Sequence, residues 1–292
     1  MRKTLVNVYL DKTFGYGDYV RGCIYLAHLS VENGLDFEFD VSQHPICFFM
    51  VSDKGSENTE VLRVFHGEMS AEVWKQKLDD FAASDETRLR VSTNFFYDNS
   101  KITKDLKGAV NSKLQIRPEY YRKVDELLPL SRYNVLHVRC SDENGIDLPR
   151  IVQSTRTLQL PKNTVVLSSD FNTKKKLQVM FGFHMCETVP AHTAYSTNVA
   201  ELESVLIDYI ILSRSASTYC FSFYGHGSGF SEQCSMLHDV AYTVCSLETG
   251  EERRNELVAR KPFRPPVRNI AAPRKAKTPL HTIRSNMRSI LN

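Results

Sequence analysis

Short apolar or alternating runs take turns with longer amphipathic segments along the first part of the chain. Period-two alternation and compact apolar runs indicate strands, whereas apolar positions spaced three and four residues apart indicate helices. The predicted strands cover residues 5–10, 35–39, 47–51 and 88–96. The predicted helices cover residues 19–32, which Asn33-Gly34 ends, and 71–81.

A second series of the same kind begins near residue 115. Its predicted strands cover residues 133–139, 164–168 and 218–223, and its predicted helices 118–128, 172–180, 199–212 and 228–239. Two successive β/α series predict a two-lobed α/β protein with mainly parallel sheets, with lobes at 1–114 and 115–258. Ligands of such sheets bind beyond the carboxyl ends of the strands, so we expect the functional site in the cleft between the lobes.

Composition narrows the class of protein. The chain has 292 residues, of which 42% are hydrophobic and 24% charged, as is usual for globular proteins. It lacks a run of about 18 apolar residues, and its first ten residues lack the apolar stretch of a signal peptide. The seven cysteines are far apart and form no CxxC, which argues against a disulfide framework and a zinc ribbon. We therefore expect a cytoplasmic protein.

The net charge of +3 hides a basic tail at 259–292, which carries nine Lys or Arg residues and no acid. Five of the eleven prolines also fall there. Like charges and prolines oppose compaction, so we expect this tail to be disordered. It would suit an acidic partner or an anionic membrane surface. Lys and Arg alone give salt-sensitive, unspecific nucleic-acid binding, so no specific nucleic-acid partner is expected.

The turn Gly15-Tyr16-Gly17-Asp18 follows the first predicted strand. Glycines let the backbone approach a ligand closely, and a helix start offers N–H groups to an anion. A plain turn capped by Asp18 explains the same residues. A dinucleotide-binding motif fits poorly, because Val20 stands where the third glycine would be.

A second candidate lies at the end of the strand 133–139, where His137 and Arg139 share one face because side chains alternate along a strand. A guanidinium at this place can hold a phosphate with two hydrogen bonds. Acids follow in the loop, including Asp142 and Asp147. The alternative is a structural arginine that pairs with those acids.

Two further turns follow later strands. Ser168-Ser169-Asp170 has hydroxyls and a carboxylate suited to sugar hydroxyls, or else it caps the helix that follows. The glycine- and serine-rich segment 223–231 includes Ser228, Phe230 and Ser231 and predicts a second anion-binding turn, opposite the first. His226 has no second ligand at metal-binding spacing, so no metal site is predicted.

Three other features have structural interpretations. Residues 36–40 alternate as a half-exposed strand, Lys174-Lys175-Lys176 suits a solvated helix face, and Trp74 suits packing.

Taken in order, the four turns resemble those of the fucosyltransferase superfamily, especially the α1,6-fucosyltransferases and their bacterial relatives. That family has a Gly-Tyr-Gly turn after its first strand. It then has a strand-end His-x-Arg followed by an Asp, a Gly and a further acid, and His137, Arg139, Asp142, Gly145 and Asp147 match that spacing. The small-residue pair before Asp170 and the serine-rich turn with Phe230 resemble the family's later motifs.

The resemblance implies two Rossmann-like lobes of the GT-B type. It also implies an inverting glycosyltransferase that moves fucose from GDP-fucose, or a sugar from another nucleotide, to a glycan acceptor without a cofactor. Arg139 would hold the pyrophosphate, His137 would lie beside the nucleotide, and Asp170 would approach the sugar. Asp147 would occupy the place of the general base, with Asp18 or Asp142 as the next choices.

The sequence also departs from the family pattern. Cys140 replaces a second arginine, Phe171 replaces a second acid, and Ala216-Ser217-Thr218 stands where we expect an aspartate beside guanine. The chain offers no convincing acid pair for a metal, which favours a metal-free site. The alternatives are a glycosyltransferase-like protein that only binds a glycan or a partner, a dinucleotide-dependent oxidoreductase, and a nucleic-acid binder acting through the tail.

Overall fold

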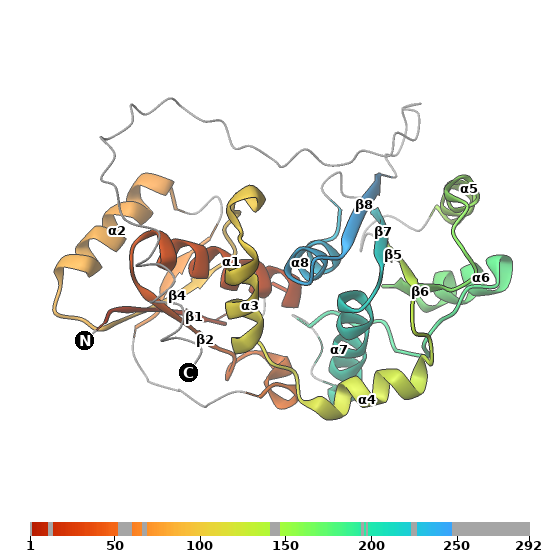
Figure 1. Cartoon of the computed structure of the whole chain (residues 1–292), viewed down its shortest axis with the longest axis horizontal. Coiled ribbons are helices and arrows are strands. Elements are labelled where there is room, and N and C mark those ends of the chain that lie inside the picture. Colours follow the sequence, from red (N-terminus) through yellow and green to blue (C-terminus); the bar gives the residue numbers. More distant parts are fainter. Residues whose placement is uncertain are drawn as a thin grey trace.

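The computed structural model describes residues 2–10, 14–51, 60–65, 69–140, 147–193, 196, 198–222 and 227–246. These residues form two α/β lobes that lie side by side (Figure 1). The predicted fold class is thereby confirmed. The basic tail at 259–292, Asp142, Gly145 and His226 lie outside the described residues.

The first lobe is built on a parallel sheet of four strands in the order β2-β1-β4-β3. The interior strand β1 is buried along its whole length, including its polar residues Thr4 and Asn7. The elements are β1 (Thr4–Val8), α1 (Tyr16–Glu32), β2 (Asp36–Asp40), the 3₁₀ helix η1 (Pro45–Phe49), β3 (Leu62–Val64), α2 (Ala71–Ala83), β4 (Arg88–Thr93), the 3₁₀ helix η2 (Asn99–Lys101) and α3 (Lys104–Lys113).

The second lobe repeats this plan with a parallel sheet in the order β6-β5-β7-β8. In each sheet the strand that comes first in the sequence, β1 or β5, is flanked by a strand on both sides. The elements are α4 (Pro118–Leu127), β5 (Asn134–Arg139), α5 (Leu148–Leu158), β6 (Thr164–Ser168), α6 (Phe171–Phe181), α7 (Val199–Ser213), β7 (Ser217–Ser222), α8 (Gly229–Leu237) and β8 (Ala241–Ser246).

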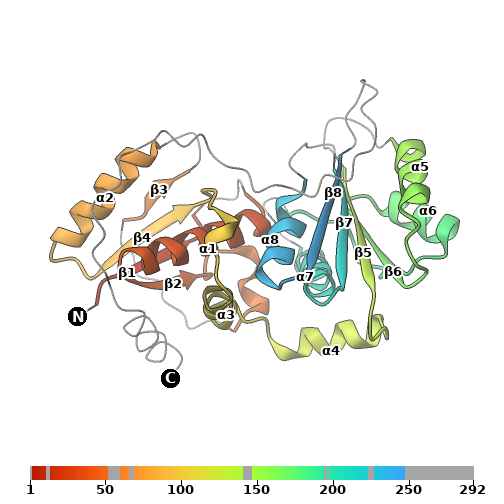
Figure 2. The ribbon, with the colours of Figure 1, turned by 45° about the horizontal axis from the view of Figure 1, so that its top comes forward.

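The two faces of the second sheet have different neighbours. Leu136 and Val138 of β5 pack in a cluster with residues of α5 and α6, whereas Val135 belongs to the core that also contains residues of the first lobe. Helix α8 lies on the side of the sheet toward the first lobe, and α5 and α6 lie on the far side (Figures 1 and 2). Because side chains alternate along a strand, His137 and Arg139 follow Val135 toward the first lobe.

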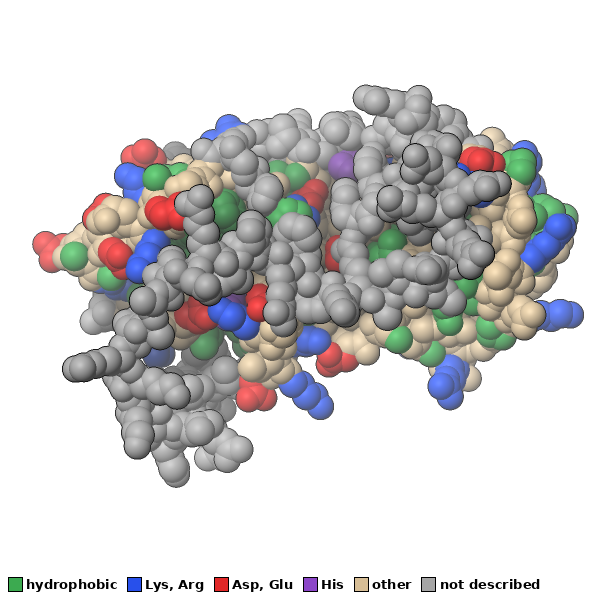
Figure 3. All heavy atoms as spheres, turned by 90° about the horizontal axis from the view of Figure 1, so that it is seen from above, with side chains coloured by type: hydrophobic (Ala, Val, Ile, Leu, Met, Phe, Trp, Pro, Cys, Tyr) green, Lys and Arg blue, Asp and Glu red, His purple; other side chains and the backbone are tan. Residues whose placement is uncertain are grey.

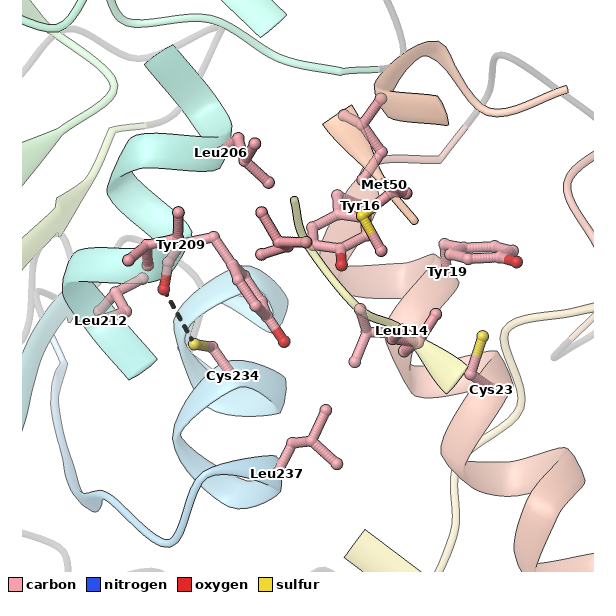
Figure 4. Packing of buried hydrophobic residues seen from close by; sticks show 14 of the residues in the cluster. Tyr16, Tyr19, Cys23, Met50, Leu114, Leu206, Tyr209, Leu212, Cys234 and Leu237 are labelled. Carbon is pink, nitrogen blue, oxygen red and sulfur yellow. Dashed lines mark hydrogen bonds between the residues drawn. The ribbon is translucent and has the colours of Figure 1, made fainter. Parts of the chain in front are cut away.

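One hydrophobic core joins the lobes. Tyr16 and Tyr19 of α1 share it with Tyr209 of α7 and with Cys234 and Leu237 of α8 (Figure 4). The rings of Tyr16 and Tyr209 meet edge to face with their centroids 4.9 Å apart. Helices α1 and α8 lie side by side in both ribbon views (Figures 1 and 2). The start of α1 is therefore held firmly against the second lobe.

The strand predicted at residues 47–51 is wrong, because the chain forms η1 there instead. Pro45 sits in the first turn of η1, and the Nδ1 of His44 accepts a hydrogen bond from the N–H of Ile46 at 3.1 Å. The His44 cap and Pro45 both favour the start of a helix, so the apolar residues that follow adopt a helical turn and not an extended strand. The prediction also omitted β3, α3, α5 and β8, which the structure adds.

Two structural interpretations hold and one is corrected. Trp74 is buried in the first lobe, and β2 is partly exposed as expected. Lys174 does not lie on a solvated face: its side chain is fully buried, whereas Lys175 and Lys176 are exposed. On α6 it shares the inward face with Leu177, three residues further on.

Charged side chains of both signs are interspersed along the rim of the face drawn in Figure 3. Over the stretches of chain that the structure describes, none of the helices combines the length and apolar character needed to cross a membrane.

The segment that joins the lobes is hydrogen-bonded to the first lobe, since the N–H of Val51 donates to the carbonyl of Gln115 at 2.8 Å. The boundary at residues 114 and 115 stays a prediction.

Candidate active site

A pocket of about 220 Å³ lies between the lobes, at the carboxyl ends of β5 and β6. The start of α1 forms the wall from the first lobe. The second lobe contributes residues 190–193, part of α7 and the start of α8. The pocket thus lies where parallel strands of an open sheet meet a neighbouring lobe, the usual place for a ligand.

The first wall is the turn that opens α1. The carbonyl of Gly15 accepts hydrogen bonds from the N–H groups of Asp18 and Tyr19, both at 3.1 Å, and Thr193 Oγ1 accepts from the N–H of Tyr16 at 2.8 Å. A β-carbon on Gly15 would lie 3.1 Å from the ring of His192. The turn therefore packs closely against the second lobe at Gly15, where a larger residue would have to displace the His192 ring.

An ion pair continues this wall. Asp18 Oδ1 lies 2.8 Å from an amino nitrogen of Arg21, whose Nε donates to the carbonyl of Asn94 at 2.8 Å. The guanidinium of Arg21 also covers the ring of Phe96, 4.4 Å from its centroid. Arg21 lines the pocket beside Asp18. Sequence reasoning overlooked Arg21, although its position three residues after Asp18 on a helix indicated the pair.

His137 and Arg139 lie at the end of β5, and both line the pocket. His137 Nδ1 is 2.9 Å from the hydroxyl of Ser231, and its ring meets that of Phe230 with centroids 6.2 Å apart. Burial, together with the charge of Arg139, lowers the pKa of His137 to about 3. The imidazole is therefore neutral near pH 7, and Nδ1 is already used by Ser231.

The start of α8 lines the pocket from the second lobe, next to the start of α1. Ser228 and Phe230 line the pocket, whereas Ser231 is buried beneath it and contacts His137. Tyr242 donates to the carbonyl of Ser228 at 3.4 Å. The two helix starts singled out from the sequence thus both line the pocket, but they touch one another rather than lying on opposite sides of it, since a β-carbon on Gly17 would lie 2.5 Å from the backbone of Phe230.

Two of the predicted acids are helix caps. Asp170 Oδ2 accepts from the N–H of Thr173 at 2.6 Å, and Asp147 Oδ1 accepts from the N–H of Arg150 at 3.1 Å. Among the described residues that line the pocket, neither acid is present, but Ser168 and Ser169 are. Ser169 Oγ accepts from the N–H of Cys140 at 3.0 Å, so it fixes the end of β5 beside Arg139.

Asp208 of α7 is a carboxylate in the pocket that sequence reasoning missed. Its Oδ1 accepts from the hydroxyl of Thr188 at 2.9 Å. Burial raises the pKa of Asp208, and Lys174 and the Thr188 hydrogen bond oppose that rise. Ser217, near which we expected an aspartate, is the first residue of β7. It therefore lies at the amino ends of the strands, away from the pocket at their carboxyl ends. Asp208 lies nine residues earlier, in the apolar helix α7.

Apolar groups line the pocket near these polar ones. Val205, one helical turn before Asp208, contributes to the wall, as do Pro190 and Ala191. In the parts of the chain that the structure describes, no three His, Cys, Asp or Glu side chains come together in a way that could hold a metal ion.

The sequence matches no protein-family model and no curated protein. Solved structures do share its fold. The NodZ α-1,6-fucosyltransferase soaked with GDP-fucose superposes with a TM-score of 0.55 and 13% identity, over 85% of this chain and 96% of that one. NodZ from Bradyrhizobium, determined as a selenomethionine protein, gives a TM-score of 0.56 and 11% identity over the same shares of the two chains.

A plant protein has the same architecture. A variant of Arabidopsis thaliana FUT1 in complex with GDP superposes with a TM-score of 0.56 and 11% identity, over 85% of this chain and 72% of that one. At such low identity the likeness concerns the arrangement of lobes and sheets. The chain therefore has a fucosyltransferase-like, two-lobed GT-B fold.

Proposed function

We propose that this protein is an inverting, metal-independent glycosyltransferase that moves fucose from GDP-fucose to a glycan acceptor. The observation that carries the proposal is the convergence of two helix starts and the Arg139 guanidinium on one pocket. That arrangement suits a diphosphate. Similar folds are found in NodZ soaked with GDP-fucose and in a FUT1 variant in complex with GDP.

The diphosphate would lie in the pocket beside the adjoining starts of α1 and α8. Backbone N–H groups and the helix dipole make a helix start attractive to anions. Arg139 adds a planar cation that can hold phosphate oxygens with two hydrogen bonds. When the bond to the sugar breaks, negative charge collects on the diphosphate, and these groups would stabilise it by about 2.7–4 kcal/mol each.

The nucleobase would lie against the pocket wall formed by Val205, Pro190 and Ala191. Guanine presents two neighbouring donors on its Watson–Crick edge, the N1–H and the 2-amino group. A carboxylate accepts from both at once, and Asp208 is the carboxylate on α7 beside Val205. Its presence favours guanine over bases whose edges present acceptors at those positions.

In the transfer step, the acceptor hydroxyl would attack the anomeric carbon from the side opposite the diphosphate, which inverts the configuration. A carboxylate would take the hydroxyl proton. We keep Asp147 as the first choice for this base and Asp18, which lines the pocket, as the alternative. Asp142 is a further candidate for the base. Asp170 would approach the sugar from the end of β6.

The test is to incubate the purified protein with GDP-fucose and a panel of fucose acceptors, and to follow fucosylated product and released GDP. The proposal expects GDP release that depends on the acceptor and survives EDTA. A reaction with UDP-sugars and none with GDP-fucose would contradict the choice of donor. GDP binding without turnover on any acceptor would favour a binding module of glycosyltransferase shape.

A further inference from the structure

Lys174 is a fully buried lysine one layer behind the pocket. Lysine is almost never buried completely unless a partner compensates its charge. Its ammonium group donates to Thr188 Oγ1 at 2.6 Å and to the Thr188 carbonyl at 3.3 Å. No step of the proposed reaction uses Lys174, so its burial needs another explanation.

The contacts form a directed chain. Because Thr188 Oγ1 accepts from Lys174, the single hydroxyl hydrogen of Thr188 is left to donate to Asp208 Oδ1 at 2.9 Å. Lys174 comes from α6, Thr188 from the segment after α6, and Asp208 from α7. A threonine hydroxyl thus links a buried ammonium to the carboxylate that lines the pocket.

The surrounding charges support this arrangement. Burial alone disfavours the ionised form of Asp208, and Lys174 acts in the opposite direction. The Cys186 thiol interacts with both Asp208 and Lys174; burial raises its pKa to about 11, so it is neutral near pH 7. Lys174 is therefore the cation that compensates Asp208 within its buried surroundings.

We infer that Lys174 is a positioning residue of the donor site, which acts through Thr188 to keep Asp208 ionised and aimed at the nucleobase. This inference rests on the proposed function, because it assigns Lys174 a part in selecting the base. A lysine in this role need not touch the nucleotide. Its effect is expected on base selectivity rather than on diphosphate affinity.

The experiment compares GDP with IDP, which lacks only the 2-amino group, by calorimetric titration. The wild-type chain should prefer GDP by roughly ten- to a hundredfold, the range for a hydrogen bond to a charged group. Lys174→Met keeps the volume of the side chain but removes its charge, and the preference should fall toward unity. Lys175→Met, on the exposed side of α6, is the matched control and should keep the preference.

Two further variants separate positioning from simple damage. Thr188→Val removes the linking hydroxyl while leaving Lys174 in place, and it should also lower the GDP-to-IDP ratio. In an Asp208→Asn background, adding Lys174→Met should not reduce the ratio further, because both changes act on the same group. General damage to the fold would weaken GDP and IDP binding equally and leave their ratio unchanged.

The outcomes point to different failures. A wild-type preference for GDP that survives in both Lys174→Met and Thr188→Val would overturn the role of Lys174 and leave the proposed function standing. If Lys174→Met does not fold, Thr188→Val alone decides. A wild-type chain that binds neither GDP nor IDP would overturn the proposed function, and the role of Lys174 with it.

Discussion

Gly17 of α1 lies directly against the backbone of Phe230 in α8. A β-carbon on Gly17 would stand 2.5 Å from both the Cα and the nitrogen of Phe230, closer than real β-carbons approach backbone atoms. The two helix starts that face the pocket are therefore joined through a contact that only glycine permits. This contact links a residue of the first lobe to the proposed diphosphate site in the second.

Gly17→Ala should destabilise the protein by about 1–3 kcal/mol, the usual cost of overpacking, and should weaken nucleotide binding as the helix starts move apart. Thermal unfolding and GDP titration measure the two effects. Gly108→Ala is the control, because Gly108 lies in α3 with open space around its β-position. That change should stabilise the protein by about 0.5–1 kcal/mol. Equal stability of the two variants would contradict the contact.

Arg139→Ala should lower turnover by about 10²–10³, because it removes a preorganised group beneath the leaving diphosphate. The kcat with GDP-fucose is the quantity to measure, on protein shown to be folded. Arg156→Ala, on the exposed side of α5 away from the pocket, should keep normal turnover. A folded Arg139→Ala variant with near-normal kcat would remove Arg139 from the mechanism.

Asp147→Asn tests the general base without disturbing the fold. Asn caps a helix about as well as Asp, so the start of α5 should survive the change and unfolding should shift little. Loss of the carboxylate should lower kcat by roughly 10²–10⁴, the range for a positioned base. Normal turnover in this variant would eliminate Asp147 and move the assignment to Asp18, which Asp18→Asn then examines.

Stability should fall as the pH drops below about 6.5. His137 and His44 are buried and His238 is half-buried, and burial lowers the pKa values of His137, His44 and His238 to about 3, 3 and 4. The unfolded chain therefore binds protons that the folded chain excludes, at up to about 1.4 kcal/mol per pH unit for each histidine. This stabilising contribution is fully present above pH 6.5 and decreases as the pH falls toward 3.

His137→Gln should reduce that pH slope between about 4 and 6, as denaturant titrations at several pH values would reveal. Ser231→Ala is the control, because it removes the hydrogen-bond partner of Nδ1 but leaves the titrating ring. It should lower stability and keep the slope. An identical slope in His137→Gln and the wild-type chain would show that His137 is not buried as a neutral group.

Regular patterns made most of the fold predictable. The run at residues 164–168 is buried on both faces, and β6 has the same limits as the prediction. The apolar run at residues 47–51 was wrongly predicted as a strand, because periodicity does not distinguish a short strand from a capped 3₁₀ turn with Pro45 at its start. The short β3 and the polar α3 carry too little apolar pattern to be recognised.

The site was predictable where chemistry follows a strand end or a glycine turn. His137, Arg139 and Gly15 were found in this way, and all three line the pocket. Asp208 and Lys174 were missed because each sits on a helix whose sequence explains it otherwise, as part of an apolar helix and of a lysine run. Only the meeting of α6 and α7 through Thr188 reveals their relation.

The most direct test of the central claim is a thermal-shift panel with GDP, UDP, ADP and NAD. A ligand present at a hundred times its dissociation constant adds about 2.7 kcal/mol to the stability of the folded chain. We expect GDP to give the largest shift, and we expect Arg139→Ala to reduce it. A larger shift with UDP, ADP or NAD, or no shift with any of the four, would contradict the proposed GDP-sugar site.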